Sequence, residues 1–291
     1  MTVEYLYLLL AMTFSATITI GGRLYNDRNK DKRNVSLLYN VLSACGNAFV
    51  WMVLWIFDFS FDVRVLPYCA LLGIFVGLFN MGMIGALKYG STSVTALVKQ
   101  MALVGISAWG FVFWDVQLTW LTGIGIVLIV ISLTLCLLNK KAGPQVGNFW
   151  KWAFFAVLIT VGNAGIGIVL RYQQMAFDYQ HKNMFMFFGV LLGAVFCTLL
   201  ALREDKKYWK AAIRSSWMFA GLAGSSSALS NVFILLMIQR QMSSSVIYPG
   251  IAVGGLMITT LISFIGFRER LRPLQWVGLA VGAVALVFLN I

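Results

Sequence analysis

Charged residues are scarce in this chain of 291 residues: Asp, Glu, Lys and Arg together make up 11%, whereas hydrophobic residues make up 60%. A soluble domain usually carries about 25% charged residues. The chain therefore cannot cover a globular surface with solvated side chains. This composition excludes a soluble enzyme, a secreted disulfide scaffold and a disordered chain. What remains is a protein that crosses a membrane several times.

Groups that carry chemistry are equally scarce. The single histidine, His181, falls in an expected loop, and the four cysteines are far apart with no CxxC pair. No zinc-protease, phosphate-loop or serine-hydrolase motif occurs. We therefore expect no enzyme activity, with no catalytic residues, no metal site and no cofactor. The acidic residues lie in or beside expected loops, so a relay of buried carboxylates for a proton or sodium ion is not expected either.

Ten apolar segments follow one another along the chain. A helix needs about 20 residues to cross a bilayer, and backbone polar groups in lipid must be bonded within the segment. The segments are 3–22, 35–57, 65–87, 91–114, 116–138, 150–170, 183–202, 217–239, 244–267 and 273–291. The sequence thus predicts an all-α integral membrane protein with ten transmembrane helices.

The basic residues predict the orientation of these helices. The loops after the odd-numbered segments hold 17 Lys and Arg residues, and the loops after the even-numbered ones hold four. Basic loops stay in the cytoplasm, so we expect both termini outside, in a multi-pass protein of the cell (plasma) membrane. The net charge of +12 is read as this topology signal and not as a nucleic-acid interface.

The two halves of the chain share polar landmarks in the same order. Asn80 precedes Lys88 and a Ser-Thr-Ser-Val run, as Asn231 precedes Arg240 and a Ser-Ser-Ser-Val run. This pattern predicts two five-helix repeats, 1–139 and 150–291, with 140–149 as a linker. Since five is odd, the second repeat enters the membrane inverted. Inverted repeats are common in secondary transporters, where the solute binds near the midplane between the halves.

The motifs of the last two helices in each half carry a family resemblance. In the second half these are Ser243-Ser-Ser-Val-Ile-Tyr-Pro249, Gly266-Phe-Arg-Glu269-Arg-Leu271 and Gln275-Trp-Val-Gly278. In the first half they are Gly90-Ser-Thr-Ser-Val94, Asp115 and Thr122-Gly123. With these motifs the chain resembles the drug/metabolite transporter superfamily, of the ten-helix EamA type. The resemblance implies metabolite transport by alternating access, often as efflux.

Seven polar residues within the segments are candidates for substrate binding. They are Lys99, Asn80, Asn163, Asn231, Ser230, Tyr248 and Ser15. Lys99 is the one clearly intramembrane ionisable residue, and we expect it to attract a carboxylate or phosphate. The alternatives are a lysine that reaches the interface and, for the asparagines, a hydrogen bond between helices.

The sequence as a whole predicts a secondary transporter for a small organic solute, such as an amino acid or a similar metabolite. The alternatives are a channel-like facilitator, a non-transporting membrane scaffold and, less in keeping with the missing motifs, a membrane enzyme. The expected partners are the small-molecule solute and membrane lipids, with no nucleic acid, for a protein that acts as a monomer or homodimer.

Overall fold

The computed structural model describes residues 2–29, 35–89, 92–114, 119–137, 149–202, 206–266 and 273–290. In these ranges the chain forms ten α-helices and one short 3-10 helix at Val63–Val65, with no strand. The α-helices are α1 (Thr2–Arg28), α2 (Ser36–Phe57), α3 (Leu66–Tyr89), α4 (Thr92–Phe113), α5 (Trp120–Leu137), α6 (Phe149–Ala176), α7 (Lys182–Ala201), α8 (Trp209–Gln239), α9 (Ser244–Gly266) and α10 (Pro273–Asn290). The predicted all-α fold is confirmed. The predicted linker, except its last residue, lies outside the described residues. Asp115 and Glu269 lie outside them as well.

Seven helices of the described chain are long and apolar enough to cross a membrane: α1, α2, α3, α6, α7, α8 and α9. The apolar parts of α4, α5 and α10 are shorter, at Val98–Phe113, Trp120–Leu135 and Pro273–Phe288. At 1.5 Å per residue, such stretches span about 24 Å, which is less than the roughly 30 Å hydrocarbon core of a bilayer. The structure thus has the helices of a multi-pass membrane protein.

Three helices continue well beyond the apolar segments that the sequence outlines. The segments 3–22, 150–170 and 217–239 become α1, α6 and α8, which run over Thr2–Arg28, Phe149–Ala176 and Trp209–Gln239. A charged residue does not end a helix, because the backbone hydrogen bonds continue past it and the side chain can find partners on neighbouring helices. One consequence is that Arg171, expected in a loop, lies inside α6.

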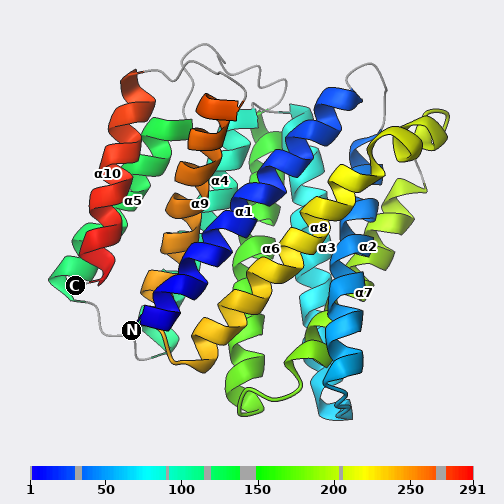
Figure 1. Ribbon diagram of the computed structural model, residues 1–291, viewed down its shortest axis with the longest axis horizontal. Coiled ribbons are helices and arrows are strands. Elements are labelled where there is room, and N and C mark those ends of the chain that lie inside the picture. The colour runs from blue at the N-terminus through cyan, green and yellow to red at the C-terminus, as the bar shows by residue number, and fades with distance from the viewer. Residues whose placement is uncertain are drawn as a thin grey trace.

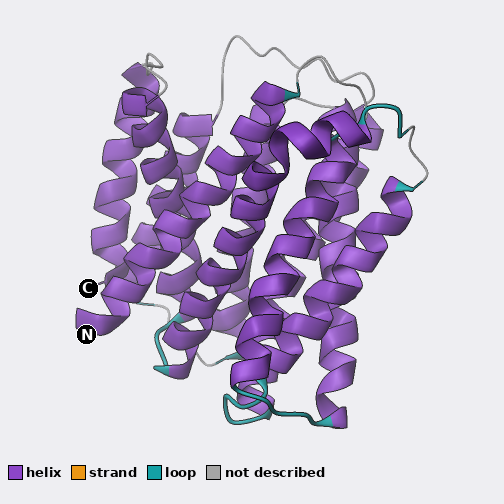
Figure 2. Cartoon of the chain, turned by 45° about the vertical axis from the view of Figure 1, so that its right-hand side comes forward, coloured by secondary structure: helices purple, strands orange, loops and turns teal. Residues whose placement is uncertain are grey.

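The helices pack as pairs across one bundle. Figure 1 shows α5 beside α10 at one end and α2 near α7 at the other, with α1 and α8 crossing the front together. Behind them α3 packs against α6, and α4 contacts both α6 and α9. Helices α2 and α3 also pack against α8 and α7, respectively. The start of α1 and the end of α10 lie at the same edge of the bundle (Figures 1 and 2).

Glycines allow some of these helices to approach closely. A Cβ on Gly189 would lie 2.4 Å from a methyl carbon of Leu72, and one on Gly193 would lie 2.4 Å from a methyl carbon of Val76. The small-residue spacing in α7 is therefore used to seat the side chains of α3.

Large apolar side chains cover the outer surface of the bundle. Phe154, Leu199 and Val284, on three different helices, are 57%, 59% and 49% exposed. A soluble monomer rarely exposes so much contiguous apolar surface. This surface suits a protein surrounded by lipid tails.

Candidate functional site

A cavity of about 80 Å³ lies between four helices of the bundle. Its lining residues are Ile106 of α4, Asn163, Ile166, Gly167 and Leu170 of α6, Asn231 and Ile234 of α8, and Tyr248 and Ile251 of α9. Most of this lining is apolar, with three polar side chains among it. An apolar pocket with a few convergent polar groups is the usual form of a small-molecule site.

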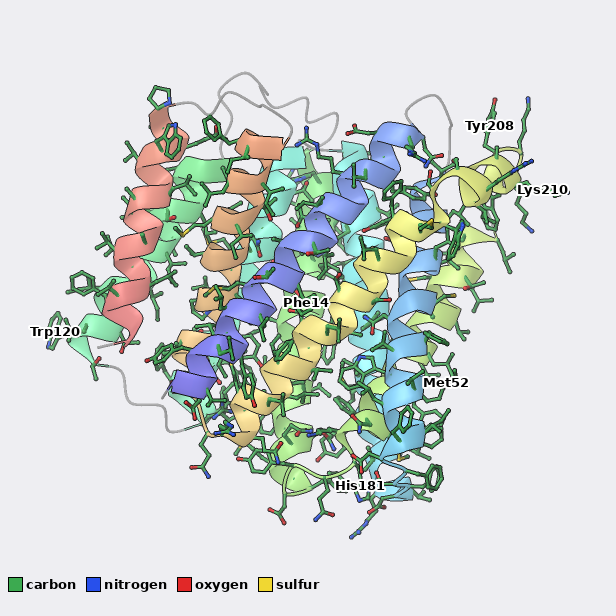
Figure 3. The ribbon with its side chains drawn as sticks, viewed as in Figure 1. Phe14, Met52, Trp120, His181, Tyr208 and Lys210 are labelled. Atoms are coloured by element: carbon green, nitrogen blue, oxygen red, sulfur yellow. The ribbon has the colours of Figure 1, made fainter. Side chains whose placement is uncertain are left out.

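The cavity has a defined position between the two faces of the bundle. We call the face formed by loop residues 58–62, 177–181 and 240–243 the His181 face; in Figure 3 it is the lower edge, and Tyr208 lies at the opposite edge. Helix α6 ends at this face and α9 begins there. Tyr248 is in the second turn of α9, so the cavity lies in the half of the bundle nearer the His181 face.

Asn163 connects two walls of the cavity. Its side-chain Nδ2 donates to the backbone carbonyl of Lys99 over 2.9 Å, which joins α6 to α4. The amide oxygen of Asn163 is still available as an acceptor, because this bond uses only the nitrogen. The contact also places the backbone of Lys99 level with one end of the cavity.

Tyr248 of α9 also lines the cavity. Its side chain is 3% exposed, and its hydroxyl donates to the Gly167 carbonyl over 3.2 Å. Gly167 lacks the Cβ that would lie 2.4 Å from the tip of Ile106 and 3.2 Å from the Tyr248 ring. The glycine therefore leaves room at this level for the side chains of Ile106 from α4 and Tyr248 from α9.

Asn231 reaches the cavity from α8. Within the described part of the chain its amide has no hydrogen-bond partner, although the side chain is half-buried. Its amide donors and acceptor are therefore available for hydrogen bonds with a solute in the cavity.

The ammonium group of Lys99 lies outside the cavity lining. Its Nζ is 5.9 Å from the centre of the Phe79 ring on α3, at the range of a cation–π contact. The described residues provide no carboxylate partner for it. Lys99 is thus a half-buried, uncompensated cation beside the cavity.

The remaining three candidates take part in contacts within or between helices. Asn80 donates to the Val76 carbonyl of its own helix over 2.9 Å, and Ser230 donates to the Ala11 carbonyl of α1 over 3.2 Å. Ser15 packs against α9, where a Cβ on Gly255 would lie 3.0 Å from its Oγ. Of the seven candidates, the structure places Asn163, Asn231 and Tyr248 on the cavity wall.

Arg171 is a residue near the cavity that the sequence reasoning missed. Its guanidinium carbon lies 4.8 Å from the centre of the Trp114 ring, and its Nη1 donates to the Ser244 hydroxyl. The prediction of topology assigned Arg171 to a loop, because it follows the end of an apolar segment. The helical spacing from Asn163, which puts residues 163, 167 and 171 on one face, is the signal that identifies it.

The described residues contain no group of three or more His, Cys, Asp and Glu side chains that could hold a metal ion.

Comparisons with known proteins support the fold alone. No protein-family model and no curated protein sequence matches the chain. Among solved structures, one described only as the crystal structure of a protein superposes with a TM-score of 0.74 at 11% identity. The match covers 99% of this chain and 96% of that one. At this identity the likeness speaks for a shared arrangement of helices and not for a shared solute.

Proposed function

We propose that the protein is a secondary transporter that moves a small organic solute by alternating access, as a member of the EamA type of drug/metabolite transporters. The observation that supports this most is a correspondence between helix pairs. When every helix number is shifted by five, α3–α6 becomes α8–α1, α2–α8 becomes α7–α3, and α1–α9 becomes α6–α4. The pairs α2–α7, α4–α9 and α5–α10 map onto themselves.

Two copies of a five-helix unit related by a twofold axis would produce such a correspondence. Because each copy has an odd number of helices, the axis lies in the membrane plane and the copies are inverted. In this proposal α4, α5 and α10 also cross the membrane, which makes ten spans. The two similar halves then exchange conformations, and the site opens first to one side and then to the other.

The cavity supports the role of a solute site in a closed state. Its volume of about 80 Å³ has room for a few water-sized molecules but is far below the roughly 300–1,000 Å³ of pockets for organic ligands. Binding of a metabolite therefore requires α4 and α9 to move away from α6 and α8. In the widened cavity Asn163, Asn231 and Tyr248 would hydrogen-bond the solute, and Lys99 would attract an anionic group.

Transport is tested with purified protein reconstituted in liposomes. We first screen amino acids, sugars, nucleosides and organic acids by the shift they cause in melting temperature, and then measure uptake of each hit. Saturable uptake supports the proposal, uptake that rises linearly with concentration supports a channel-like facilitator, and no stabilisation or uptake supports a scaffold.

A variant pair connects the transport to the cavity. Asn231→Leu removes an amide that has no hydrogen-bond partner among the described residues, so we expect the melting temperature to hold and saturable uptake to fall at least about tenfold, the equivalent of one buried hydrogen bond. Thr160→Val is the control, because its hydroxyl bonds the Ala156 carbonyl of its own helix and is exposed. Equal uptake by both variants would remove Asn231 from the site.

The ten-span topology is tested by labelling from one side. After replacement of the native cysteines, single cysteines are introduced at Thr119 and Lys151, which lie on either side of α5. A membrane-impermeant maleimide should label Thr119→Cys from outside the cell and Lys151→Cys only after permeabilisation. Labelling of both from the same side would show that α5 does not cross.

A further inference from the structure

Arg171 is a cation inside the bundle with unused donor groups. It is half-buried on α6, stacked near the Trp114 ring, with Nη1 donating to the Ser244 hydroxyl. Its Nε is buried and has no hydrogen-bond partner among the described residues. An arginine has five N–H donors in a planar fork, so most of this hydrogen-bonding capacity is not used by the protein.

Arg171 lies directly beside the cavity. Gly167 and Leu170, four residues and one residue before it on α6, both line the cavity. Its partner Ser244 is one helical turn before Tyr248 on α9, and Tyr248 both lines the cavity and bonds Gly167. The guanidinium therefore sits at the end of the cavity that is nearer the His181 face.

Within the described residues no carboxylate pairs with Arg171. Helices α4, α6, α8 and α9, which line the cavity, contain no Asp or Glu. Some other arginines of the described chain have acidic partners: Arg64 pairs with Asp62 at 2.8 Å, and Arg240 pairs with Glu4 at 3.5 Å. An ionised group within a membrane bundle is costly and by default functional.

Lys99 is a second cation with no acidic partner among the described residues, and its backbone lies level with the other end of the cavity. Asn163, which bonds its carbonyl, precedes Arg171 by eight residues on α6, or about 12 Å along the helix at 1.5 Å per residue. The cavity lining thus contains no acidic group, and two cations lie near it. Such a potential attracts anions and disfavours cationic solutes.

We propose that Arg171, with the hydroxyls of Ser244 and Tyr248, binds the carboxylate or phosphate group of an organic anion at the His181-face end of the cavity. This inference rests on the proposed function and names its substrate class. The planar guanidinium accepts a carboxylate or phosphate in a two-pronged hydrogen bond, and the Trp114 ring holds its plane. The oxyanion replaces Ser244 as the partner of Nη1, and the Ser244 hydroxyl becomes a donor. The Tyr248 hydroxyl turns from the Gly167 carbonyl and donates to the oxyanion instead.

The test compares anionic probes with neutral partners of similar shape by titration calorimetry on the purified full-length protein. The first pair is succinate with succinamide, which tests recognition of a carboxylate. The second pair is glycerol 3-phosphate with glycerol, which tests recognition of a phosphate. We expect one anion of the panel to bind at least tenfold more tightly than its neutral partner. Neutral partners that bind as tightly as the anions would overturn the proposal without any variant being needed.

Variants then assign the preference to Arg171. Arg171→Gln should weaken anion binding at least tenfold, whereas Arg171→Lys should retain part of it. The matched control is Arg240→Gln, an arginine at the same face that also lies over an aromatic ring, Tyr7, but is half-exposed and paired with Glu4. Wild-type anion affinity in a folded Arg171→Gln protein would overturn the proposal.

The two proposals fail in different ways. Saturable transport of neutral solutes with no competition from succinate or glycerol 3-phosphate would overturn the role of Arg171 and leave the transporter proposal standing. Absence of both binding and transport for every solute would overturn both.

Discussion

The close contact between α2 and α8 can be tested at a single glycine. An ideal Cβ on Gly224 would lie 1.9 Å from the backbone oxygen of Ser43 and 3.0 Å from the backbone nitrogen of Asn47. Both atoms belong to the backbone of α2, so no side-chain rotation can relieve the clash. Gly224→Ala therefore forces the two helices apart along their contact.

The expected loss of stability is substantial. Overpacking a well-packed core usually costs about 1–3 kcal/mol, and here the obstacle is rigid backbone, so we expect about 3 kcal/mol or more. At roughly 2–4 °C per kcal/mol for a chain of this order of size, the melting temperature should fall by about 6–12 °C. The assay is thermal unfolding of the purified protein in detergent, followed by tryptophan fluorescence.

Gly221→Ala is the control in the same helix. A Cβ on Gly221 meets no atom within 4 Å. This variant should be neutral or stabilising by up to about 1 kcal/mol, because alanine favours a helix over glycine. If Gly224→Ala melts at the same temperature as Gly221→Ala, the packing of α2 against α8 described here is incorrect.

Three further predictions concern single side chains. Ser230→Ala removes the hydrogen bond to the Ala11 carbonyl and should cost about 0.6 kcal/mol in thermal unfolding; a loss of several kcal/mol would contradict so small a role. Tyr248→Phe keeps the ring but removes the hydroxyl. Loss of its bond to the Gly167 carbonyl should lower the stability by only about 1 kcal/mol. Loss of its bond to the solute should lower the solute affinity, measured by calorimetry, about tenfold. Unchanged affinity would exclude the hydroxyl from the site. The hydrogen bonds from Arg64 hold the pKa of the Asp62 carboxyl below its usual range. The stability that this pair contributes is therefore fully present above the ordinary pKa of Asp. It is lost as the pH falls through the lowered pKa of Asp62. Asp62→Asn should therefore melt with a flatter pH dependence below about pH 4 than the wild type, and parallel curves would refute this.

The sequence alone was sufficient to predict the class of fold. An apolar segment in lipid must satisfy its backbone polar groups within the protein. Outside a closed barrel, only a helix does so. The order of the ten helices follows from the order of these runs. Their ends were less well predicted: Arg171 was placed in a loop because a basic residue closed the apolar run, yet α6 continues to Ala176.

The candidate site was only partly predictable. Polar residues within apolar helices could be picked out, and three of them, Asn163, Asn231 and Tyr248, line the cavity. Their role in solute binding stays a prediction. Ser230 has the same residue chemistry and sits next to Asn231, but its hydroxyl bonds to α1. The sequence shows which face of a helix is polar, whereas the neighbouring helix decides whether that face meets backbone or open space.

Local chemistry therefore determined that this chain forms apolar helices, in which order, and which side chains are expensive to bury in lipid. Only the tertiary structure decided that α4, α6, α8 and α9 enclose a cavity and that two cations flank it without an acidic partner from the described chain. The physical reason is the range of the interactions. Helix formation depends on hydrogen bonds between residues four apart, whereas the surroundings of Arg171 are set by Trp114, just after α4, and by Ser244 at the start of α9.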